Sequence, residues 1–555
     1  MKKRLVLIAV LAILALVIAA CGSDAGGAGG TATPTTPPAA GNQPADQTPA
    51  PTGDGERPVL TIGVQSSIIA EDFETNWMTR YIEEALGIDL RFQLYAAELA
   101  DARAQFRLDV AGGMTLPDVI MFDFVEMELF QFAQMGVFQP LSQFINDPEV
   151  AVNINLMSES DRDFALTNIR MPDGEYYHLF EYVQFHWSEG HNRAWINQEW
   201  LDELNLPMPT TTEELYDTLT AFLAVDPSRI GMVGTMPGSG WGTQLLPFMM
   251  SPFTYVNPGR QWLHVENGEV YASFTRPEWV EGLRFLNRMF NSGLIDPMSF
   301  TQTEPELRAI AMADEAMAGM IFAGSAGLFG NMGPTMDRMM LMPPLYGPEG
   351  ENNAPMQILL PTPRWHVTRD AADPALAVMV GDFLLSDYMS AVAQFGEYGY
   401  HWTMDEEITS QWVGQYFDPP TFVVFPERTV WGVPGNTIWG TGTRFERWEF
   451  REGRAFVPID EVDTTPLRNW QGMHLEHYVP RFPAENIGRR VWTGEEMEEL
   501  AIIQTNLMTH LDTNNAMFIT GQRSIDEFDM FLAEMDALGL DRFIELSQIG
   551  HDRNQ

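Results

Sequence analysis

The amino-acid sequence predicts an α/β protein, and its first folded segment gives the main reason. Residues 59–64 have the alternating apolar side chains of a strand, and two more predicted strands follow at 88–95 and 116–123. Predicted helices at 76–86 and 103–112 separate the three strands. This alternation of strand and helix indicates a parallel sheet that is covered by helices. A chain of 555 residues, of which 45% are hydrophobic, is long enough for two or more lobes with their own cores.

The N-terminal residues predict export from the cell. Three cationic residues, 2–4, precede an apolar run at 5–18, and small residues then lead to Cys21. This order resembles a bacterial lipoprotein signal, which implies cleavage after residue 20 and acylation of the Cys21 sulfur. A plain membrane anchor is the alternative, but it needs ~20 consecutive apolar residues and this run is shorter. We therefore expect a signal peptide at 1–20 and a lipid on Cys21 that holds the protein at the outer face of the bacterial cell membrane.

Composition excludes several classes of function. The chain carries a formal net charge of −44, and the predicted signal contains cations but no acids, so the mature protein is more acidic still. A protein with such a negative net charge repels nucleic acids, and we expect no nucleic-acid partner. Cys21 is the single cysteine, which excludes intrachain disulfides, thiol catalysis and thiolate metal sites. Both lysines, Lys2 and Lys3, lie in the signal, so Schiff-base chemistry and P-loops are excluded as well.

The mature chain begins with a segment of Gly, Thr, Pro and Ala. No apolar residue larger than alanine or proline occurs between Cys21 and Val59. Such a segment cannot bury enough surface to offset its conformational entropy. Residues 21–57 are therefore expected to be a disordered tether.

The predicted sheet also indicates where a ligand would bind. Ligands of parallel α/β sheets gather at the carboxyl ends of the strands. Gln65 follows the first predicted strand, and Asp123 and Phe124 follow the third. These three residues are candidates for the walls of a ligand cleft.

Several sequence elements resemble family 1 extracellular solute-binding proteins of ABC importers. GGMTLPDV at 112–119 is similar to a G-x-x-P-D-V turn of that family, and GVFQPL at 136–141 resembles the element that follows it. Residues 197–204 and 209–215 resemble its helix pair N-x-x-W-L-D-x-L-x-x-P-x-T-x-x-E-L. Residues 518–539 are similar to the C-terminus of the long oligosaccharide-binding lipoproteins in the family. The order of these elements along one chain makes the resemblance specific.

The resemblance implies a two-lobed, periplasmic-binding-protein-like fold of type II, in which the ligand lies in the cleft between the lobes. Each lobe is expected to be a mostly parallel sheet flanked by helices. The first lobe is expected to contain approximately residues 58–185 and 360–430, and the second lobe residues 186–359 and 431–555. Residues from about 405 to 490 are rich in Trp, Arg, Gly and Pro without a period, and their organisation is not predicted.

Helix caps and one turn can be predicted locally. Thr211 or Thr212 can cap a helix, with Glu214 near its third position. Asn-Gly at 267–268 predicts a hairpin turn. The Thr-to-Glu spacing at 493–496 predicts a capping box at the start of a C-terminal helix.

No pattern indicates a cofactor or a catalytic centre. His474 and His477 lie three apart, but a proline follows almost at once and no third ligand is evident, so no metal is expected. Long members of the family often carry a calcium loop where residues 228–231 lie here, and these residues offer too few oxygen ligands. GSGWG at 238–242 is not the nucleophile elbow G-x-S-x-G. The glutamates at 495–499 suit a helix N-terminus, and we expect no enzyme activity.

Aromatic residues beside glycine are better candidates for a binding site. The C–H face of a sugar packs on a flat ring, and its hydroxyl groups need carboxylates, amides or guanidinium groups nearby. Neighbouring glycines favour exposed loops for Trp241, Trp431 and Trp439. About half of the candidate tryptophans are expected to lie in the core instead. The candidate ligand-binding residues are Gln65, Asp123, Phe124, Trp187, Trp241, Ser325, Trp402, Trp431 and Trp439.

The expected function is that of a monomeric solute-binding lipoprotein. It would close on a carbohydrate, in particular an oligosaccharide, and deliver it to the transmembrane subunits of an ABC permease. A neutral sugar is favoured, because an anionic uronate would have to be met by arginines such as Arg193, Arg364 or Arg444. One alternative is a peptide-binding or peptide-sensing lipoprotein of the same fold. Another is a secreted glycoside-active enzyme, which would need two carboxylates at a set spacing.

Overall fold

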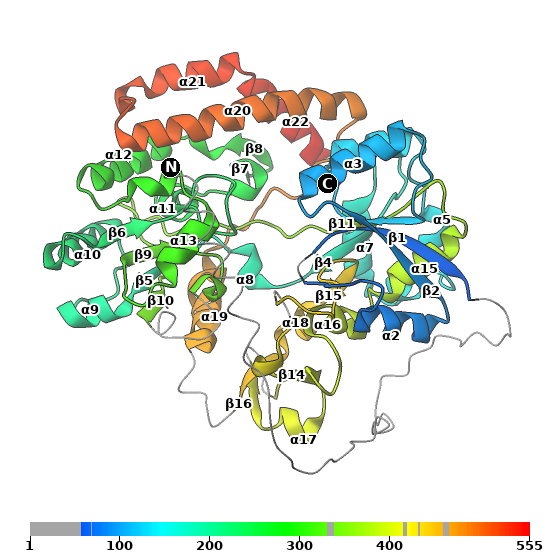
Figure 1. The fold of residues 1–555 in the computed structure, drawn as a ribbon. Coiled ribbons are helices and arrows are strands. Elements are labelled where there is room, and N and C mark those ends of the chain that lie inside the picture. The colour runs from blue at the N-terminus through cyan, green and yellow to red at the C-terminus, as the bar shows by residue number, and fades with distance from the viewer. Residues whose placement is uncertain are drawn as a thin grey trace, which may run out of the picture. The chain divides into compact units, whose positions relative to one another are not determined.

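The computed structural model describes residues 57–67, 69–329, 338–414, 419–430, 433–458 and 466–554. The predicted signal peptide, Cys21 and Trp431 lie outside these residues, as does almost all of the predicted tether. The described residues belong to one compact unit. Within it the chain forms two lobes, each built around its own sheet (Figure 1).

The first lobe contains a six-stranded sheet with the strand order β15-β4-β11-β3-β1-β2. β1 pairs in parallel with β2 and β3, which confirms the parallel arrangement predicted from the start of the chain. β11 runs antiparallel between β3 and β4, and β15 is parallel to β4. The strands are β1 (Val59–Gln65), β2 (Asp89–Tyr95), β3 (Val119–Met121), β4 (Leu179–Val183), β11 (Thr362–Val367) and β15 (Arg444–Glu446). The helices of this lobe are α2 (Trp77–Leu86), α3 (Leu99–Ala111), α4 (Glu126–Gln134), α5 (Ser142–Ile145), α6 (Val152–Leu156), α7 (Glu159–Ile169), α15 (Pro374–Phe383) and α16 (Asp387–Phe395).

Local sequence explains where helix α2 begins and ends. The Asn76 side chain accepts a hydrogen bond of 3.0 Å from the backbone N–H of Met78, and so caps the first turn. Gly87 ends the helix in the left-handed conformation with φ 66°, which glycine adopts at low cost. Met78, Ile82 and Leu86 are buried at helical spacing. The predicted helix is therefore confirmed, and its buried face covers the sheet.

The second lobe contains a four-stranded sheet with the order β10-β5-β9-β6. β5 is antiparallel to both β10 and β9, and only β6 and β9 are parallel. The prediction of a mostly parallel sheet holds for the first lobe and is wrong for the second, because β5 enters from the inter-lobe crossing and runs against its two neighbours. The strands are β5 (Ala194–Asn197), β6 (Ile230–Val233), β9 (Ala318–Phe322) and β10 (Met339–Leu341).

Helices and a hairpin surround this second sheet. The Thr211 hydroxyl caps α10, and the Glu214 carboxylate accepts a bond from the Thr211 backbone N–H, which completes the predicted capping box. The hairpin β7–β8 turns at Asn267 and Gly268, whose φ angles are 54° and 79°, as Asn-Gly predicts. The hairpin strands are β7 (Leu263–Glu266) and β8 (Glu269–Ala272). The helices are α8 (His186–Glu189), α9 (Gln198–Leu204), α10 (Thr212–Val225), α11 (Leu245–Met250), α12 (Pro277–Asn291), α13 (Glu304–Ala311), α19 (Pro466–His477), α20 (Gly494–Thr520), α21 (Phe528–Ala537) and α22 (Leu540–Asp552).

A third sheet occupies the stretch whose organisation the sequence does not predict. Its order is β12-β14-β16-β13, formed by β12 (Trp402–Thr403), β13 (Trp412–Gly414), β14 (Phe422–Val424) and β16 (Arg454–Pro458). The short helices α17 (Glu406–Thr409) and α18 (Trp448–Glu452) accompany it. Phe422 and Phe450 pack in the core of the first lobe, and β15 is part of its sheet. The predicted boundary at residue 431 is therefore wrong: residues 433–458 lie with the first lobe, and the chain is in the second lobe again at α19.

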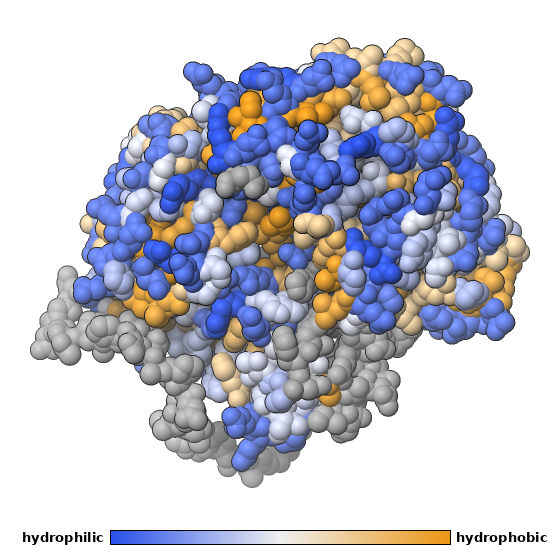
Figure 2. Space-filling view, turned by 180° about the vertical axis from the view of Figure 1, so that it is seen from behind, coloured by the Kyte–Doolittle hydropathy of each residue, from blue (hydrophilic) through white to orange (hydrophobic). Residues whose placement is uncertain are grey.

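Separate groups of buried side chains support the two lobes. One cluster lies around the second sheet and includes α20 to α22, while two clusters lie on the faces of the first sheet. Seen from behind, polar side chains cover most of the surface, and apolar ones gather near its middle (Figure 2). Within the described ranges no single helix is long and apolar enough to cross a membrane. The bent pair α15 and α16 passes that test together, with a bend of 73°, and much of it is buried in the first lobe.

The capping box of α20 allows a stability prediction. The Thr493 hydroxyl accepts a bond from the backbone N–H of Glu496, and the Glu496 carboxylate accepts one of 2.8 Å from the Thr493 N–H. Thr493→Ala is expected to lower the free energy of unfolding by about 1 kcal/mol in urea denaturation. Thr505→Ala, on the exposed middle of the same helix, is the control and should have no such cost. Equal losses in both variants would contradict a role for the cap.

Candidate ligand-binding site

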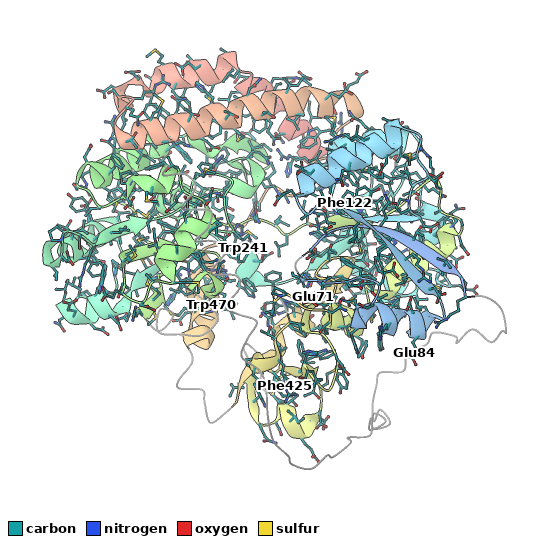
Figure 3. The ribbon with its side chains drawn as sticks, in the orientation of Figure 1. Glu71, Glu84, Phe122, Trp241, Phe425 and Trp470 are labelled. Carbon is teal, nitrogen blue, oxygen red and sulfur yellow. The ribbon has the colours of Figure 1, made fainter. Side chains whose placement is uncertain are left out.

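Three tryptophans from distant parts of the second lobe meet, and we call them the tryptophan cluster: Trp187, Trp241 and Trp470. The Trp187 ring lies 5.5 Å from Trp241 and 5.7 Å from Trp470, with edge-to-face angles of 79° and 85°. Trp187 is on α8 in the crossing between lobes, and Trp470 is on α19. Trp241 and Trp470 lie on the side of the second lobe that faces the first lobe (Figure 3). The label of Glu71 marks the first lobe in this view.

A glycine-rich loop sets the position of Trp241. Gly238, Gly240 and Gly242 all have positive φ angles, between 67° and 78°, which other residues rarely adopt. The Gly324 N–H donates a bond of 2.9 Å to the Trp241 carbonyl oxygen. A Cβ on Gly324 would lie 2.3 Å from the Trp241 ring, so only glycine permits this approach. Trp241 is 39% exposed, which confirms the loop exposure predicted from its glycine neighbours.

The side chains of His191 and Arg193 pack against this cluster. The His191 ring stacks on Trp241 at 4.9 Å and 11°, and burial lowers the pKa of His191 to about 4, so it is neutral at pH 7. Arg193 is fully buried and donates to the carbonyl oxygens of Trp187 and Gly324. Its guanidinium carbon lies 5.2 Å from the Trp470 ring centre. Arg193 therefore joins the crossing, the Gly324 loop and α19 in one arrangement.

Two donors in the cluster lack an acceptor. Among the described residues, the indole N–H groups of Trp187 and Trp470 are buried and have no hydrogen-bond partner. A buried donor without an acceptor costs about 1–3 kcal/mol. An oxygen atom of a bound ligand or of water, if it came within reach, would remove that cost.

The first lobe has a group of paired charges formed by Arg364 on β11, Glu181 on β4, Arg444 on β15 and Asp123, which follows β3. Arg364 forms ion pairs with Asp123 at 2.5 Å and with Glu181 at 2.9 Å, and Arg444 pairs with Glu181 at 2.5 Å. Burial raises the pKa of Asp123 although Arg364 opposes the shift. Burial alone would raise the pKa of Glu181, but Arg444 and Arg364 lower it below its usual range. Gln65 lies at the end of β1 and donates a bond of 2.6 Å to the Ala97 carbonyl oxygen.

The remaining candidates differ in exposure. Phe124 is buried in the aromatic core, with its ring 5.4 Å from Phe106. Trp402 is fully buried, and its indole N–H donates to the Gly396 carbonyl oxygen at 2.8 Å, so a ligand cannot stack on it. Ser325 follows Gly324 beside Trp241 and is half-buried.

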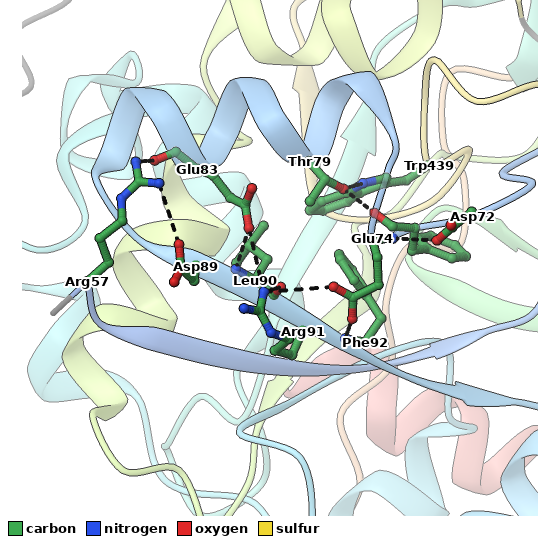
Figure 4. A network of polar contacts seen from close by, with 11 residues as sticks. Arg57, Asp72, Glu74, Thr79, Glu83, Asp89, Leu90, Arg91, Phe92 and Trp439 are labelled. Carbon is green, nitrogen blue, oxygen red and sulfur yellow. Dashed lines mark hydrogen bonds and ion pairs between the residues drawn. The ribbon is translucent and has the colours of Figure 1, made fainter.

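The expectation of an exposed loop is wrong for Trp439. Its side chain is fully buried, its indole N–H donates to the Thr79 hydroxyl at 2.8 Å, and its ring lies 5.6 Å from Phe92 (Figure 4). The contacts come from α2 and β2, about 360 residues earlier in the chain. A core position that is defined by such distant contacts overrides the local effect of glycine neighbours.

Sequence reasoning missed two members of this site. Trp470 lies in the aperiodic stretch whose organisation was not predicted, and His191 stands in no motif. Neither has a local signal, because their positions depend on how α19 and the crossing return to β5 and β9.

Among the described residues no group of three His, Asp or Glu side chains is placed to hold a metal ion. His474 accepts a bond of 3.2 Å from Arg193. The arrangement suits recognition of a ligand by ring stacking and hydrogen bonds.

Comparisons with known proteins agree with this fold. No family model matches the chain. The fructooligosaccharide ABC transporter substrate-binding protein FusA of Streptococcus pneumoniae is 23% identical over 521 residues, which cover 88% of this chain and 89% of FusA. Lipoprotein LipO of Bacillus subtilis is 25% identical over 201 residues, 35% of this chain and 36% of LipO.

Solved structures show the same arrangement. The structure of S. pneumoniae FusA in complex with kestose matches with a TM-score of 0.72 and 21% identity, over 89% of this chain and 99% of FusA. An HMO-binding, ABC-transporter-associated solute-binding protein of Bifidobacterium longum infantis matches with a TM-score of 0.72 and 18% identity, over the same shares. The chain is therefore a homologue of the substrate-binding proteins of ABC transporters, and it has their two-lobed, periplasmic-binding-protein-like fold.

Proposed function

We propose that the protein captures an oligosaccharide between its two lobes and delivers it to an ABC permease. The tryptophan cluster is the observation that carries this proposal. Trp241 presents part of a flat ring to solvent, and the indole N–H groups of Trp187 and Trp470 are buried without an acceptor among the described residues. A sugar ring supplies both an apolar C–H face for stacking and oxygens that accept hydrogen bonds. The relative FusA, which has been solved with kestose, suggests the same ligand class.

The charges near the site favour a neutral sugar. The arginines expected to meet an anionic uronate are already engaged: Arg193 with backbone carbonyl oxygens, and Arg364 and Arg444 with Glu181. Binding an acid there would require breaking these contacts in an interior where unpaired charges are costly. We propose that Gln65, Asp123 and Ser325 contribute polar contacts to the hydroxyl groups of the sugar.

Capture is proposed to occur by closure of the lobes. A ligand that touches both lobes only when they are closed shifts the population toward the closed state. No chemical step is needed, and a monomer suffices. The sequence supports attachment through a diacylated Cys21, with residues 22–57 as a tether that keeps the ligand-binding part near its permease.

Calorimetric titration of the full-length chain in detergent tests the proposal. Kestose, a maltotriose, a lacto-N-tetraose and a mixed tripeptide library form the panel. One of the sugars is expected to bind, and Trp241→Ala should weaken that sugar at least about 10-fold, which is the loss of ~1.4 kcal/mol of stacking.

The matched control is Trp412→Ala. Trp412 lies on β13 in the third sheet, half-buried and packed edge-on against Phe425 at 5.9 Å. This variant should bind the sugar like the wild type. Binding of peptides but of no sugar would overturn the carbohydrate proposal, and an equal loss in Trp412→Ala would remove Trp241 from the site.

A further inference from the structure

A cavity lies where connecting segments of both lobes meet. It has a volume of about 180 Å³ and shares no lining residue with the tryptophan cluster. Phe124, Glu126 and His178 of the first lobe line one side. Arg260 of the second lobe and the consecutive Arg489 and Arg490 line the other, and we call the space the arginine cavity.

The charge around the arginine cavity is opposite to that of the protein. Three guanidinium groups line it and Glu126 is the one carboxylate among its lining residues, while the whole chain carries −44. Burial lowers the pKa of His178 to about 4, so this histidine adds no positive charge at pH 7. A concentrated positive site in an acidic protein attracts anions from solution.

Of the three arginines, Arg489 forms an ion pair, whereas Arg260 and Arg490 form none with the described residues. Arg489 pairs with Glu126 at 2.9 Å and also donates to the Thr167 carbonyl oxygen at 2.9 Å. Arg490 is 7% exposed, and among the described residues it donates to two neutral side chains, the Ser547 hydroxyl at 3.1 Å and the Gln261 amide at 2.6 Å.

Arg260 is paired least. It donates to the Ile358 carbonyl oxygen at 3.3 Å, and its Nε has no hydrogen-bond partner among the described residues. Neither Arg260 nor Arg490 has a carboxylate within ion-pairing distance in the described part of the chain. Burial lowers the pKa of both arginines, and the nearby charge of Arg260 lowers that of Arg490 further. Both shifts show that the protein interior disfavours the charged form of these side chains.

The backbone beside Arg260 is strained. Gln261 and Trp262 both lie in the left-handed region, with φ 56° and 63°, although neither is glycine. Residues other than glycine adopt this region at an energetic cost. The Gln261 side chain accepts the bond from Arg490, so the strained turn brings Arg260 and Arg490 to the same cavity. Backbone strain of this kind concentrates at binding sites.

We propose that the arginine cavity is a second binding site, which takes a small anion whose oxygens pair with Arg260, Arg489 and Arg490. The ligand chemistry is that of a carboxylate, sulfate or phosphate, because these oxyanions match the planar guanidinium fork. The cavity volume of about 180 Å³ leaves room for several water molecules, and so for a small anion in their place. A bound anion would pair with arginines from two distant segments, Arg260 and the consecutive Arg489 and Arg490, at a place separate from the tryptophan cluster.

Calorimetric titration of the full-length chain tests the site with three probes: inorganic phosphate, sulfate and galacturonate, all at matched ionic strength in chloride. At least one probe is expected to bind saturably with one site per chain. Preference for galacturonate would identify a sugar acid as the ligand, and preference for phosphate or sulfate would identify an inorganic anion. Arg260→Gln should weaken the preferred probe at least about 10-fold, and Arg260→Lys should weaken it less because it keeps the charge.

Arg276→Gln is the matched control, since it removes the same charge from an exposed arginine of the same lobe that pairs with Glu266 at 3.0 Å. It should leave anion binding unchanged. Trp241→Ala should also keep anion binding, and Arg260→Gln should keep oligosaccharide binding, so the two sites can fail independently. If none of the three probes binds, or if Arg276→Gln weakens binding as much as Arg260→Gln, the arginine cavity is not an anion site.

Discussion

Arg193→Met is expected to lower the free energy of unfolding by about 3 kcal/mol. The wild-type side chain is fully buried and donates to two backbone carbonyl oxygens, those of Trp187 and Gly324, and to the His474 ring. Methionine fills a similar length but donates nothing, so buried acceptors are left unpaired at about 1–3 kcal/mol each. Relief from burying a charge offsets part of that loss. Urea denaturation followed by circular dichroism measures the difference.

The control for this variant is Arg284→Met on α12. Arg284 is about half exposed and pairs with Glu281 at 3.6 Å within the same helix. Such surface pairs contribute at most about 1 kcal/mol, so the control should change little. Arg193→Met should also weaken oligosaccharide binding, because Arg193 ties together the supports of Trp187 and Trp470. A stable Arg193→Met protein with unchanged binding would show that Arg193 is not the link between them.

Much of the fold can be predicted from local sequence. The parallel start of the first sheet follows from the alternation of strands and helices before Asp123. Capping boxes at Thr211 and Thr493 lie where Thr and Glu are three apart, because that motif satisfies its own backbone groups without distant partners. The family resemblance supplied the two-lobed arrangement, which strand patterns alone did not contain.

Features set by distant contacts could not be predicted. Trp241 and Trp439 both have glycine neighbours, yet one is 39% exposed and the other fully buried. Their difference is decided by Thr79 and Phe92 for Trp439 and by Gly324 for Trp241, none of which is close in sequence. The predicted lobe boundary at residue 431 is wrong for the same reason. Residues after it join the first lobe through contacts with distant segments, such as the pairing of β15 with β4.

The two binding regions were predicted to different degrees. Trp187 and Trp241 were chosen for their positions at a crossing and in a glycine loop, and the structure brings them together. Trp470 joins them only through the fold of α19. The arginine cavity has no sequence motif, because Arg260 and Arg490 are 230 positions apart and meet through a strained turn.

Acidification is expected to destabilise the protein in part through His178. This side chain is buried, its Nδ1 lies 3.1 Å from the Leu179 carbonyl oxygen, and its ring faces the His366 ring at 5.7 Å. Burial lowers the pKa of His178 from 6.5 to about 4, and the positive charge of Arg489 acts in the same direction. Between these two values the unfolded chain binds a proton that the folded chain does not. Stability is therefore greatest above pH 6.5 and falls as the pH drops toward 4.

His178→Gln removes this titration, so its free energy of unfolding should fall by about 2–3 kcal/mol less than that of the wild type between pH 7 and pH 4.5. The variant is less stable at pH 7 because it loses packing, and the two urea-derived stabilities should converge on acidification. Met171→Leu, a change at a buried neighbour without a titratable group, should shift stability equally at both pH values. Parallel pH curves for His178→Gln and the wild type would mean that protonation of His178 does not limit stability, and that other groups cause the acid sensitivity.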